Sequence, residues 1–167
     1  MSETTLRYGY CNTPVGRLLL AGDAEALQLI SFPAGSRARG PEPEWIRDDG
    51  FFPETERQLG EYFAGTRTEF TVPLRLNGTD FQNDYWTLLQ SVRFGETTTY
   101  GALAERIGRP KASRAVGAAN GANPIPIIIP CHRVIGANKS LTGFGGGIET
   151  KQYLLSHETR IATEKGS

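Results

Sequence analysis

Alternating apolar and polar positions predict β-structure in the first third of the chain. Leu6, Tyr8 and Tyr10 recur at every second position, and a turn signal follows at 14–16. Since successive side chains of a strand point to opposite faces, this spacing is typical of a sheet with one buried face. Residues 33–53 are rich in proline, glycine and charged side chains, which predicts a surface loop. Further strand-like or extended segments are expected at 18–21, 26–32 and 69–76.

The apolar spacing changes from the strand period to the helix period after residue 53. The segment 54–65 places Leu59, Tyr62 and Phe63 on one face, and Gly65 is expected to end this short amphipathic helix. None of the side chains up to this point suggests catalysis. Cys11 lies in a strand-like stretch and is expected to be a small buried hydrophobic residue.

A second helix is predicted after Asn77-Gly78, where Thr79 and Gln82 have the spacing of a capping box. Large apolar residues then recur at helical spacing, and this stripe is better explained as core than as a platform for a ligand. We therefore expect two domains, 1–78 and 79–167. The residues of the stripe are Phe81, Tyr85, Trp86, Leu88, Leu89 and Val92.

The segment 97–124 reads TTTYGALAERIGRPKASRAVGAANGANP and predicts a helix-turn-helix. Thr99 can cap a first helix, which breaks at 108–110, and a second helix is expected at 112–120. This second helix consists mainly of small residues, which would let its backbone come close to a binding partner. A helix packed in a core would use the same residues, but the basic side chains before and within it, including Arg114, favour DNA.

Charge is distributed unevenly along the 167 residues, although the net charge is zero. Residues 1–90 hold 8 Arg/Lys against 13 Asp/Glu, a balance of −5, and residues 91–140 hold 7 against 2, a balance of +5. A basic segment of this kind can face a phosphate backbone, and an unevenly charged solvated surface is the alternative. Without a long apolar run or an apolar leader, and with two cysteines far apart, we expect a cytoplasmic protein that is not embedded in a membrane.

Residues 125–136 read IPIIIPCHRVIG and place Cys131 and His132 side by side at the end of a stiff apolar run. A histidine backed by a carboxylate lowers the pKa of a thiol, which is what a cysteine nucleophile requires. Adjacent side chains rarely meet face to face, so we expect a water bridge between them and a carboxylate from elsewhere, such as Glu158 in the last helix. A core cysteine beside a surface histidine is the alternative. A zinc site would consume this same pair, and we expect neither a metal nor a cofactor.

Taken together, these segments resemble the O6-alkylguanine-DNA alkyltransferases (methylated-DNA–protein-cysteine methyltransferases) of the bacterial type. The active-site stretch NPIPIIIPCHRVIG and the Arg-Ala-Val-Gly helix are very specific, and the similarity runs from about Thr79 to Glu158. The N-terminal region matches only loosely, through TERQLGEYFAG. The resemblance implies an α/β N-terminal domain of the ribonuclease-H-like type and a mainly helical C-terminal domain with a helix-turn-helix.

The resemblance also implies roles for individual residues. Cys131 corresponds to the alkyl acceptor, His132 acts through water on its thiol, and Glu158 orients His132. Asn123 holds the active-site turn, and Tyr100 meets the guanine ring at N3. The implied substrate-binding residues are Val134, Pro126, Phe144 and Gly145, and the implied DNA-binding residues are Arg114, Ser113, Ala115 and Gly117.

Two positions depart from the pattern of the family in the loop 142–147. Phe144 stands where many relatives have tyrosine, which removes any hydroxyl contact, and Gly145 stands where serine or alanine is common. A backbone N–H from position 145 to the guanine oxygen is still available. Consecutive glycines should also make this loop looser before DNA is bound.

The activity implied is DNA repair by a single-use protein. The monomer would flip O6-alkylguanine out of double-stranded DNA and transfer the alkyl group irreversibly to Cys131, so that each molecule reacts once. Acceptance of O4-alkylthymine and clustering on DNA are left open. Two other classes are considered: a lesion sensor without repair, which would lack the acceptor cysteine, and a Cys-His hydrolase, which would turn over and leave the helix-turn-helix unexplained.

Overall fold

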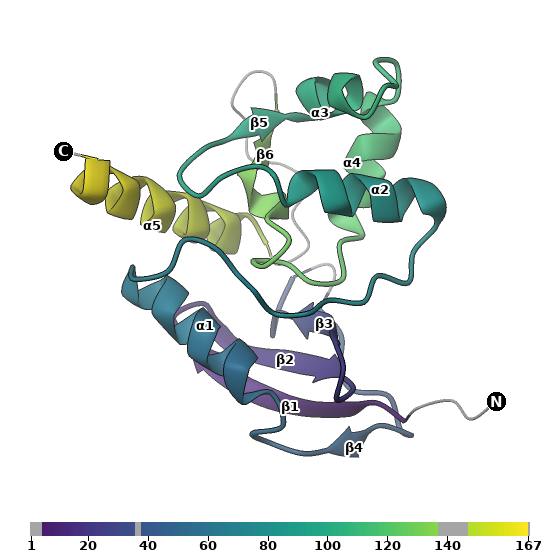
Figure 1. Ribbon diagram of the computed structural model, residues 1–167, viewed down its shortest axis with the longest axis vertical. Helices are drawn as coiled ribbons and strands as arrows, with labels where there is room; N and C mark the ends of the chain where they lie inside the picture. The colour runs from purple at the N-terminus through teal and green to yellow at the C-terminus, as the bar shows by residue number, and fades with distance from the viewer. Residues whose placement is uncertain (1–4, 36–37, 137–146, 167) are drawn as a thin grey trace.

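The N-terminal part of the computed structural model, which describes residues 5–35, 38–136 and 147–166, is a small mixed sheet covered by one helix (Figure 1). The strands follow the spatial order β3-β2-β1-β4, in which β1, β2 and β3 are antiparallel and β4 runs parallel to β1. Their bounds are β1 (Arg7–Thr13), β2 (Gly16–Gly22), β3 (Leu27–Ser31) and β4 (Ile46–Arg47).

Strand β4 lies inside the segment 33–53, which the sequence predicts as a loop, so that prediction is wrong at this point. The amide of Ile46 donates to the carbonyl of Leu6 at 3.0 Å, and the amide of Asp48 donates to that of Tyr8 at 2.7 Å. A strand of two residues at the edge of a sheet produces no hydrophobic periodicity in the sequence, because neither of its side chains enters the core.

The two faces of the sheet bury different sets of side chains, as the alternation predicts. Leu18, Leu20 and Ile30 belong to the main core, while Leu19 and its neighbours form a smaller cluster on the other face, partly covered by aromatic side chains. The main core lies under helix α1 (Pro53–Ala64), whose Leu59 is fully buried. Proline opens this helix. Gly65 ends it, as predicted, in the left-handed conformation with φ 81°.

The segment 69–76 is an extended piece and not a regular strand. It touches the sheet through one bridge between Leu74 and Leu27, where the amide of Leu27 donates to the carbonyl of Pro73 and the amide of Arg75 donates to that of Leu27. The chain then enters the second part, which is mainly helical.

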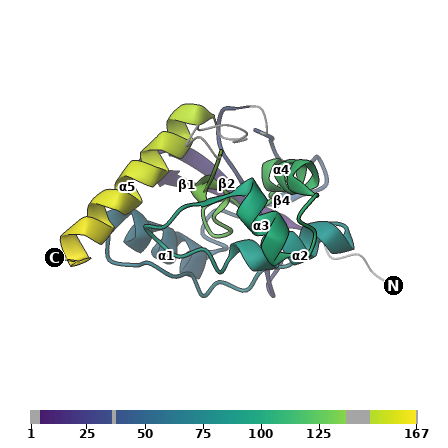
Figure 2. The same cartoon turned by 90° about the horizontal axis from the view of Figure 1, so that it is seen from above.

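Helix α5 runs along one side of the C-terminal part, and α2, α3 and α4 gather on the other (Figure 2). None of the helices in the described part of the chain is long and apolar enough to cross a membrane. The elements are α2 (Asp80–Leu89), β5 (Thr98–Thr99), α3 (Tyr100–Arg106), α4 (Ser113–Gly121), the 3-10 turn η1 (Cys131–Arg133), β6 (Val134–Ile135) and α5 (Ile148–Gly166).

The start of α2 confirms the predicted capping box. The hydroxyl of Thr79 accepts from the amide of Gln82, and the side chain of Gln82 accepts from the amide of Thr79. Such a cap contributes about 1 kcal/mol to helix stability. Large apolar residues that follow in α2, including Tyr85, Trp86 and Leu89, are buried, so the aromatic stripe is core.

Helices α3 and α4 pack against each other around a tight turn and form the predicted helix-turn-helix. Thr99 caps α3 by accepting from the amide of Ala102, and Gly108 turns the chain with φ 82°. Helix α4 begins at Ser113, one residue later than predicted. The indole N–H of Trp86 donates to the carbonyl of Ala119 at 2.8 Å, which fixes α4 on α2.

The two parts share one continuous hydrophobic core, in which Leu18 and Leu20 of the sheet join Ile125 and Ile129 of the proline-isoleucine run. The amide of Ile30 in β3 also donates to the carbonyl of Pro124 at 2.9 Å. The run that precedes Cys131 is therefore packed between the two parts, and this packing fixes the position of Cys131.

Candidate functional site

The turn that leads into Cys131 is closed by the side chain of Asn123. Its amide donates to the carbonyl of Ile129 at 2.8 Å, and its carbonyl oxygen accepts from the amide of Ile125 at 3.0 Å. The amide of Cys131 donates to the carbonyl of Ile129 at 2.8 Å. Ile127, at the tip, has φ 74°, which is strained for a β-branched residue and persists only because its surroundings over-determine it.

Cys131 opens the turn η1 and is 4% exposed. Burial raises the pKa of its thiol to about 11, although the Asn123 amide, the charge of Lys151 and nearby backbone N–H groups act in the opposite direction. The sequence predicted a lowered pKa, and the structure corrects this: desolvation exceeds the stabilisation of the thiolate. At neutral pH the resting cysteine is therefore a protonated thiol, and a base has to remove its proton.

His132 points one ring nitrogen toward Glu158. Its Nε2 lies 2.6 Å from Oε2 of Glu158, and both side chains are buried to 1% exposure or less. Burial lowers the pKa of His132 more than the Glu158 carboxylate raises it, so the resting imidazole is neutral. Because the ionised carboxylate can only accept, Nε2 carries the proton and Nδ1 presents a lone pair.

The Nδ1 atom of His132 is the buried side-chain nitrogen that lacks a hydrogen-bond partner within residues 5–35, 38–136 and 147–166. A buried acceptor without a partner is costly, which makes such atoms informative. His132 therefore has one ring nitrogen held by Glu158 and the other available to a proton.

Glu158 is held by donors from three other parts of the chain. Arg133 donates from Nε to Oε1 at 2.8 Å and from a terminal nitrogen to Oε2 at 3.0 Å, and the amide of Gly95 donates to Oε1 at 3.3 Å. The hydroxyl of Tyr62, from α1, donates to Oε2 at 2.6 Å. Burial alone would raise the pKa of Glu158, but the hydrogen bonds from His132 and Arg133 and the positive charge of Arg133 outweigh it and hold that pKa well below its ordinary value.

Two positively charged residues that sequence reasoning assigned no role lie at this site. Arg133 is 6% exposed and also donates to the carbonyl of Val92 at 2.6 Å. Lys151 of α5 is fully buried, and its Nζ donates to the carbonyl of Val134 at 2.5 Å. Burial lowers the pKa of Lys151, while the neighbouring Cys131 raises it. A local sequence signal for Arg133 exists only in its position directly after Cys-His.

The other predicted residues lie in different parts of the structure. Tyr100, at the start of α3, lies beside Gly117, since a Cβ at Gly117 would lie 4.0 Å from the Tyr100 ring. Pro126 is buried and bridges to Ile129. Phe144 and Gly145, with most of the loop 142–147, lie outside the described residues. The first turn of α4 exposes the predicted DNA-binding residues Ser113, Arg114 and Ala115, whereas Gly117 is half-buried.

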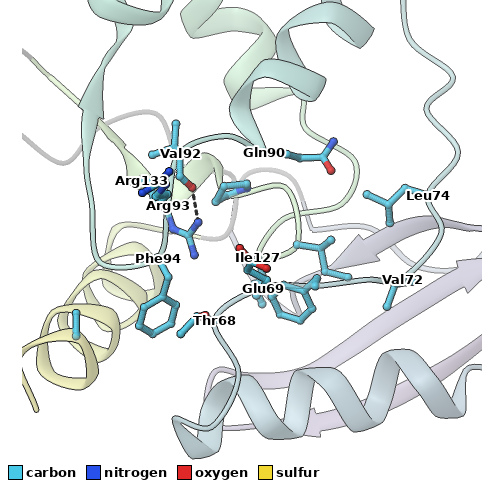
Figure 3. Close-up of a pocket in the computed structure, with 14 residues that line it drawn as sticks. Thr68, Glu69, Val72, Leu74, Gln90, Val92, Arg93, Phe94, Ile127 and Arg133 are labelled. Atoms are coloured by element: carbon cyan, nitrogen blue, oxygen red, sulfur yellow. Dashed lines mark hydrogen bonds between the residues drawn. The ribbon is translucent and has the colours of Figure 1, made fainter. Parts of the chain in front are cut away.

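A cavity of about 470 Å³ lies between the two parts of the chain and is lined in part by Arg133 (Figure 3). Its described lining includes Phe94, Gln90 and Glu69 but neither Cys131 nor His132. It is therefore separate from the thiol. The described residues also contain no group of three His, Cys, Asp or Glu side chains that could hold a metal ion.

Comparison with known proteins gives a consistent result along the chain. The family model of the 6-O-methylguanine DNA methyltransferase ribonuclease-like domain matches residues 6–76, and that of the DNA binding domain matches residues 80–160. A methylated-DNA–protein-cysteine methyltransferase of Methanosarcina acetivorans is 48% identical over 151 residues, covering 90% of this chain and 97% of the relative. One from Haemophilus influenzae is 45% identical over 167 residues, covering 98% and 92%.

Solved structures agree with the sequence relatives. The crystal structure of Mycobacterium tuberculosis OGT in complex with DNA superposes with a TM-score of 0.88 at 46% identity, covering 93% of this chain and 94% of that chain. The similarity includes both the mixed-sheet part and the helical part, which confirms the predicted fold class. With a cysteine, a histidine and a carboxylate gathered where the sequence places the signature, the chain belongs to the methylated-DNA–protein-cysteine methyltransferase family.

Proposed function

We propose that this chain is a DNA repair protein that transfers the alkyl group of O6-alkylguanine in double-stranded DNA to its own Cys131. The observation that carries the proposal is the buried arrangement of Cys131, His132 and Glu158, in which His132 keeps one free basic nitrogen. Names of relatives at 45–48% identity support the same reaction. We also propose a domain boundary between residues 78 and 79 and a cytoplasmic location.

The reaction needs a thiolate at a site where the thiol is favoured. His132 Nδ1 would take the proton of the Cys131 thiol through a water molecule, and Glu158 would stabilise the resulting imidazolium. The sulfur then attacks the alkyl carbon, the carbon–oxygen bond breaks, and its electron pair leaves with the guanine. Tyr100 would help to neutralise the leaving base at N3, and the proton lost by the thiol balances the one gained by guanine.

The product explains why each molecule would act once. The alkyl group ends as a thioether on Cys131, and no second nucleophile is proposed to release it. Water would not displace the cysteine sulfur from the alkyl carbon at neutral pH. The thioether therefore persists, and the protein is consumed in the reaction. The acceptor is part of the chain, and the alkyl donor is the damaged base itself.

The exposed first turn of α4 is the proposed contact with DNA. The alkylated oxygen lies inside a paired duplex, and the base must be extruded at a cost of a few kcal/mol, least for a damaged pair. Arg114 is exposed at this turn and would fill the space left by the base. The minor groove is about 6 Å wide, which suits a helix with small side chains such as Ala115 and Gly117. The DNA complex of the tuberculosis relative supports this choice of partner.

Two backbone carbonyls would read the exocyclic amine of the base. The carbonyl of Val134 already accepts from Lys151, and that of Cys131 accepts from the side-chain amide of Asn120 at 3.3 Å. Each carbonyl oxygen has two lone pairs, so the Val134 carbonyl keeps one for the amine of guanine. The Cys131 carbonyl also accepts from the amide of Val134, so one of its two protein donors would have to be displaced by the amine. Pro126 would form part of a stiff wall of the same pocket.

Intact-protein mass spectrometry after mixing with a duplex that carries one O6-methylguanine tests the proposal. A gain of one methyl group per protein, with unmodified guanine left in the DNA, is expected. Cys131→Ser should abolish the gain while retaining DNA binding, and Cys11→Ser is the matched control, expected to react like the wild type. Binding without any mass gain would indicate a lesion sensor, and cleavage of substrate with turnover would indicate a hydrolase.

A further inference from the structure

A tyrosine of the N-terminal part reaches into the site where the chemistry is proposed. The hydroxyl of Tyr62, on α1, lies 2.6 Å from Oε2 of Glu158, and the two residues are 96 positions apart in the chain. Oε2 is the same oxygen that holds Nε2 of His132 at 2.6 Å. Tyr62 and His132 therefore share one carboxylate oxygen.

Tyr62 is fixed at both its ends. Its side chain is fully buried, and its carbonyl accepts from Nε2 of His157 at 2.8 Å. Three phenyl rings surround its own, with centroid distances of 5.0 Å to Phe63, 5.6 Å to Phe70 and 5.9 Å to Phe94. Neighbouring residues 157 and 158 of α5 thus both bond to Tyr62, which leaves its hydroxyl little freedom to point elsewhere.

The hydroxyl acts as a neutral donor. Burial and the adjacent Glu158 raise the pKa of Tyr62, so the hydroxyl stays protonated and donates. The other charged or titratable groups around this network are Arg133 and Lys151, which act on His132, and Tyr153, which acts weakly on Tyr62. The ring of His157 packs on that of Tyr62, and the thiol of Cys131 acts on Lys151. Arg133 supplies positive charge to both carboxylate oxygens, whereas Tyr62 takes electron density from one oxygen without adding charge.

We infer that Tyr62 is a positioning residue for the alkyl transfer, because its hydroxyl orients the Glu158 carboxylate and limits how strongly Oε2 attracts the proton of His132. The inference rests on the proposed function. A carboxylate that lost this donor would pull harder on the proton of Nε2 and stabilise the imidazolium, so the network would bind a proton at higher pH. Since a protonated His132 cannot accept the thiol proton, the N-terminal part would help to keep the base free at neutral pH.

The test is the pH dependence of the single-turnover rate constant with free O6-benzylguanine, measured between about pH 4.5 and 8. The wild-type rate should fall only on the acid side, since the pKa of His132 is lowered from 6.5. Tyr62→Phe keeps the ring and loses the hydroxyl. The acid limb of the pH–rate profile of this variant should move to higher pH by about half a unit, and its plateau rate constant should fall less than about tenfold.

Two further variants separate positioning from packing. Tyr153 lies on α5, stacks its ring on His157 and is 41% exposed. Tyr153→Phe removes its hydroxyl and should leave the acid side of the pH–rate profile unchanged. Incorporating 3-fluorotyrosine at position 62 keeps the fold and strengthens the donor, and should move the limb downward. The chain has two histidines, so the titration of His132 can also be followed directly by nitrogen NMR, with His157→Gln to assign the signals.

Each outcome is decisive. An upward shift for Tyr62→Phe and a downward shift for the fluorinated residue support the inference. A uniform rate loss at all pH values, or an equal shift in Tyr153→Phe, overturns it and leaves Tyr62 as packing. Absence of alkyl transfer in the wild type would instead refute the proposed function, so the two failures can be told apart.

Discussion

Replacing Arg133 with methionine should destabilise the fold far more than a surface change of the same kind. The substitution keeps much of the side-chain volume but removes both hydrogen bonds to Glu158, at 2.8 and 3.0 Å, and the bond to the Val92 carbonyl at 2.6 Å. Glu158 would remain buried and ionised without its main counter-charge. Breaking a buried pair by removing one partner costs about 3–5 kcal/mol.

That loss is a large share of the roughly 5–15 kcal/mol that holds a typical domain folded. For a chain of this length it corresponds to a fall in the melting temperature of about 6–20 °C. Urea denaturation followed by circular dichroism measures it as a change in the midpoint at constant slope. Arg57→Met is the matched control. Arg57 lies on α1, is 52% exposed and pairs with Glu54 and Glu61, so water screens these pairs and the urea midpoint should change little on its loss.

The pH dependence gives a second check. The folded-state pKa of Glu158 lies below its ordinary value of 4.5, so its contribution to stability is fully present above pH 4.5 and is lost as pH falls through the folded-state pKa. The destabilisation of Arg133→Met should therefore shrink in acid, where Glu158 is protonated in both proteins. The double variant Arg133→Met/Glu158→Gln should lose about 1–3 kcal/mol less than the sum of the single variants. A cost below about 1 kcal/mol for Arg133→Met at pH 7, or strict additivity, would refute the buried-pair reasoning.

Three other outcomes are expected. Arg114→Ala should slow repair of duplex DNA far more than reaction with free O6-benzylguanine, because a free base needs no extrusion; equal losses in the two rate constants would contradict this role. Gly65→Ala should cost about 1–2 kcal/mol in urea denaturation, since φ is 81° and the new Cβ would lie 2.6 Å from Cδ1 of Ile161, whereas Gly60→Ala, with open space around it, should stabilise α1 by about 0.5–1 kcal/mol. Asn123→Ala should cost about 1–3 kcal/mol and slow alkyl transfer, and unchanged kinetics would show that the turn is held without it.

Local signals were sufficient for much of the fold. The capping box at Thr79, the helix stop at Gly65 and the cap at Thr99 depend on residues within four positions of each other, and all three are confirmed. Strand β4, which runs parallel to β1, could not be predicted, because its pairing with β1 depends on backbone groups about 40 residues apart. Segment 69–76 was ambiguous for a similar reason, since a single bridge does not require a strand pattern.

The site was only partly predictable. The sequence indicated Cys131, His132 and Glu158, but the sign of the thiol pKa shift was wrong, because burial of Cys131 depends on the packing of both parts of the chain. Tyr62 was placed correctly on the inner face of its helix, yet nothing local connects it to Glu158, 96 residues away. The same holds for the full burial of Lys151, which no periodicity in α5 requires.

The attachment of β3 to the rest of the chain also protects an edge that would otherwise be open to other molecules. On its outer side this strand bonds through Leu27 to the extended segment at Pro73 and Arg75, and through Ile30 to Pro124. An unpaired edge strand is a template for intermolecular pairing. A fragment that ends at residue 78 would lose the Pro124 contact together with the apolar cover of the sheet. We therefore expect the isolated N-terminal part to aggregate through β3. The helical part thus protects the edge of the sheet from intermolecular pairing, in addition to containing the reactive thiol.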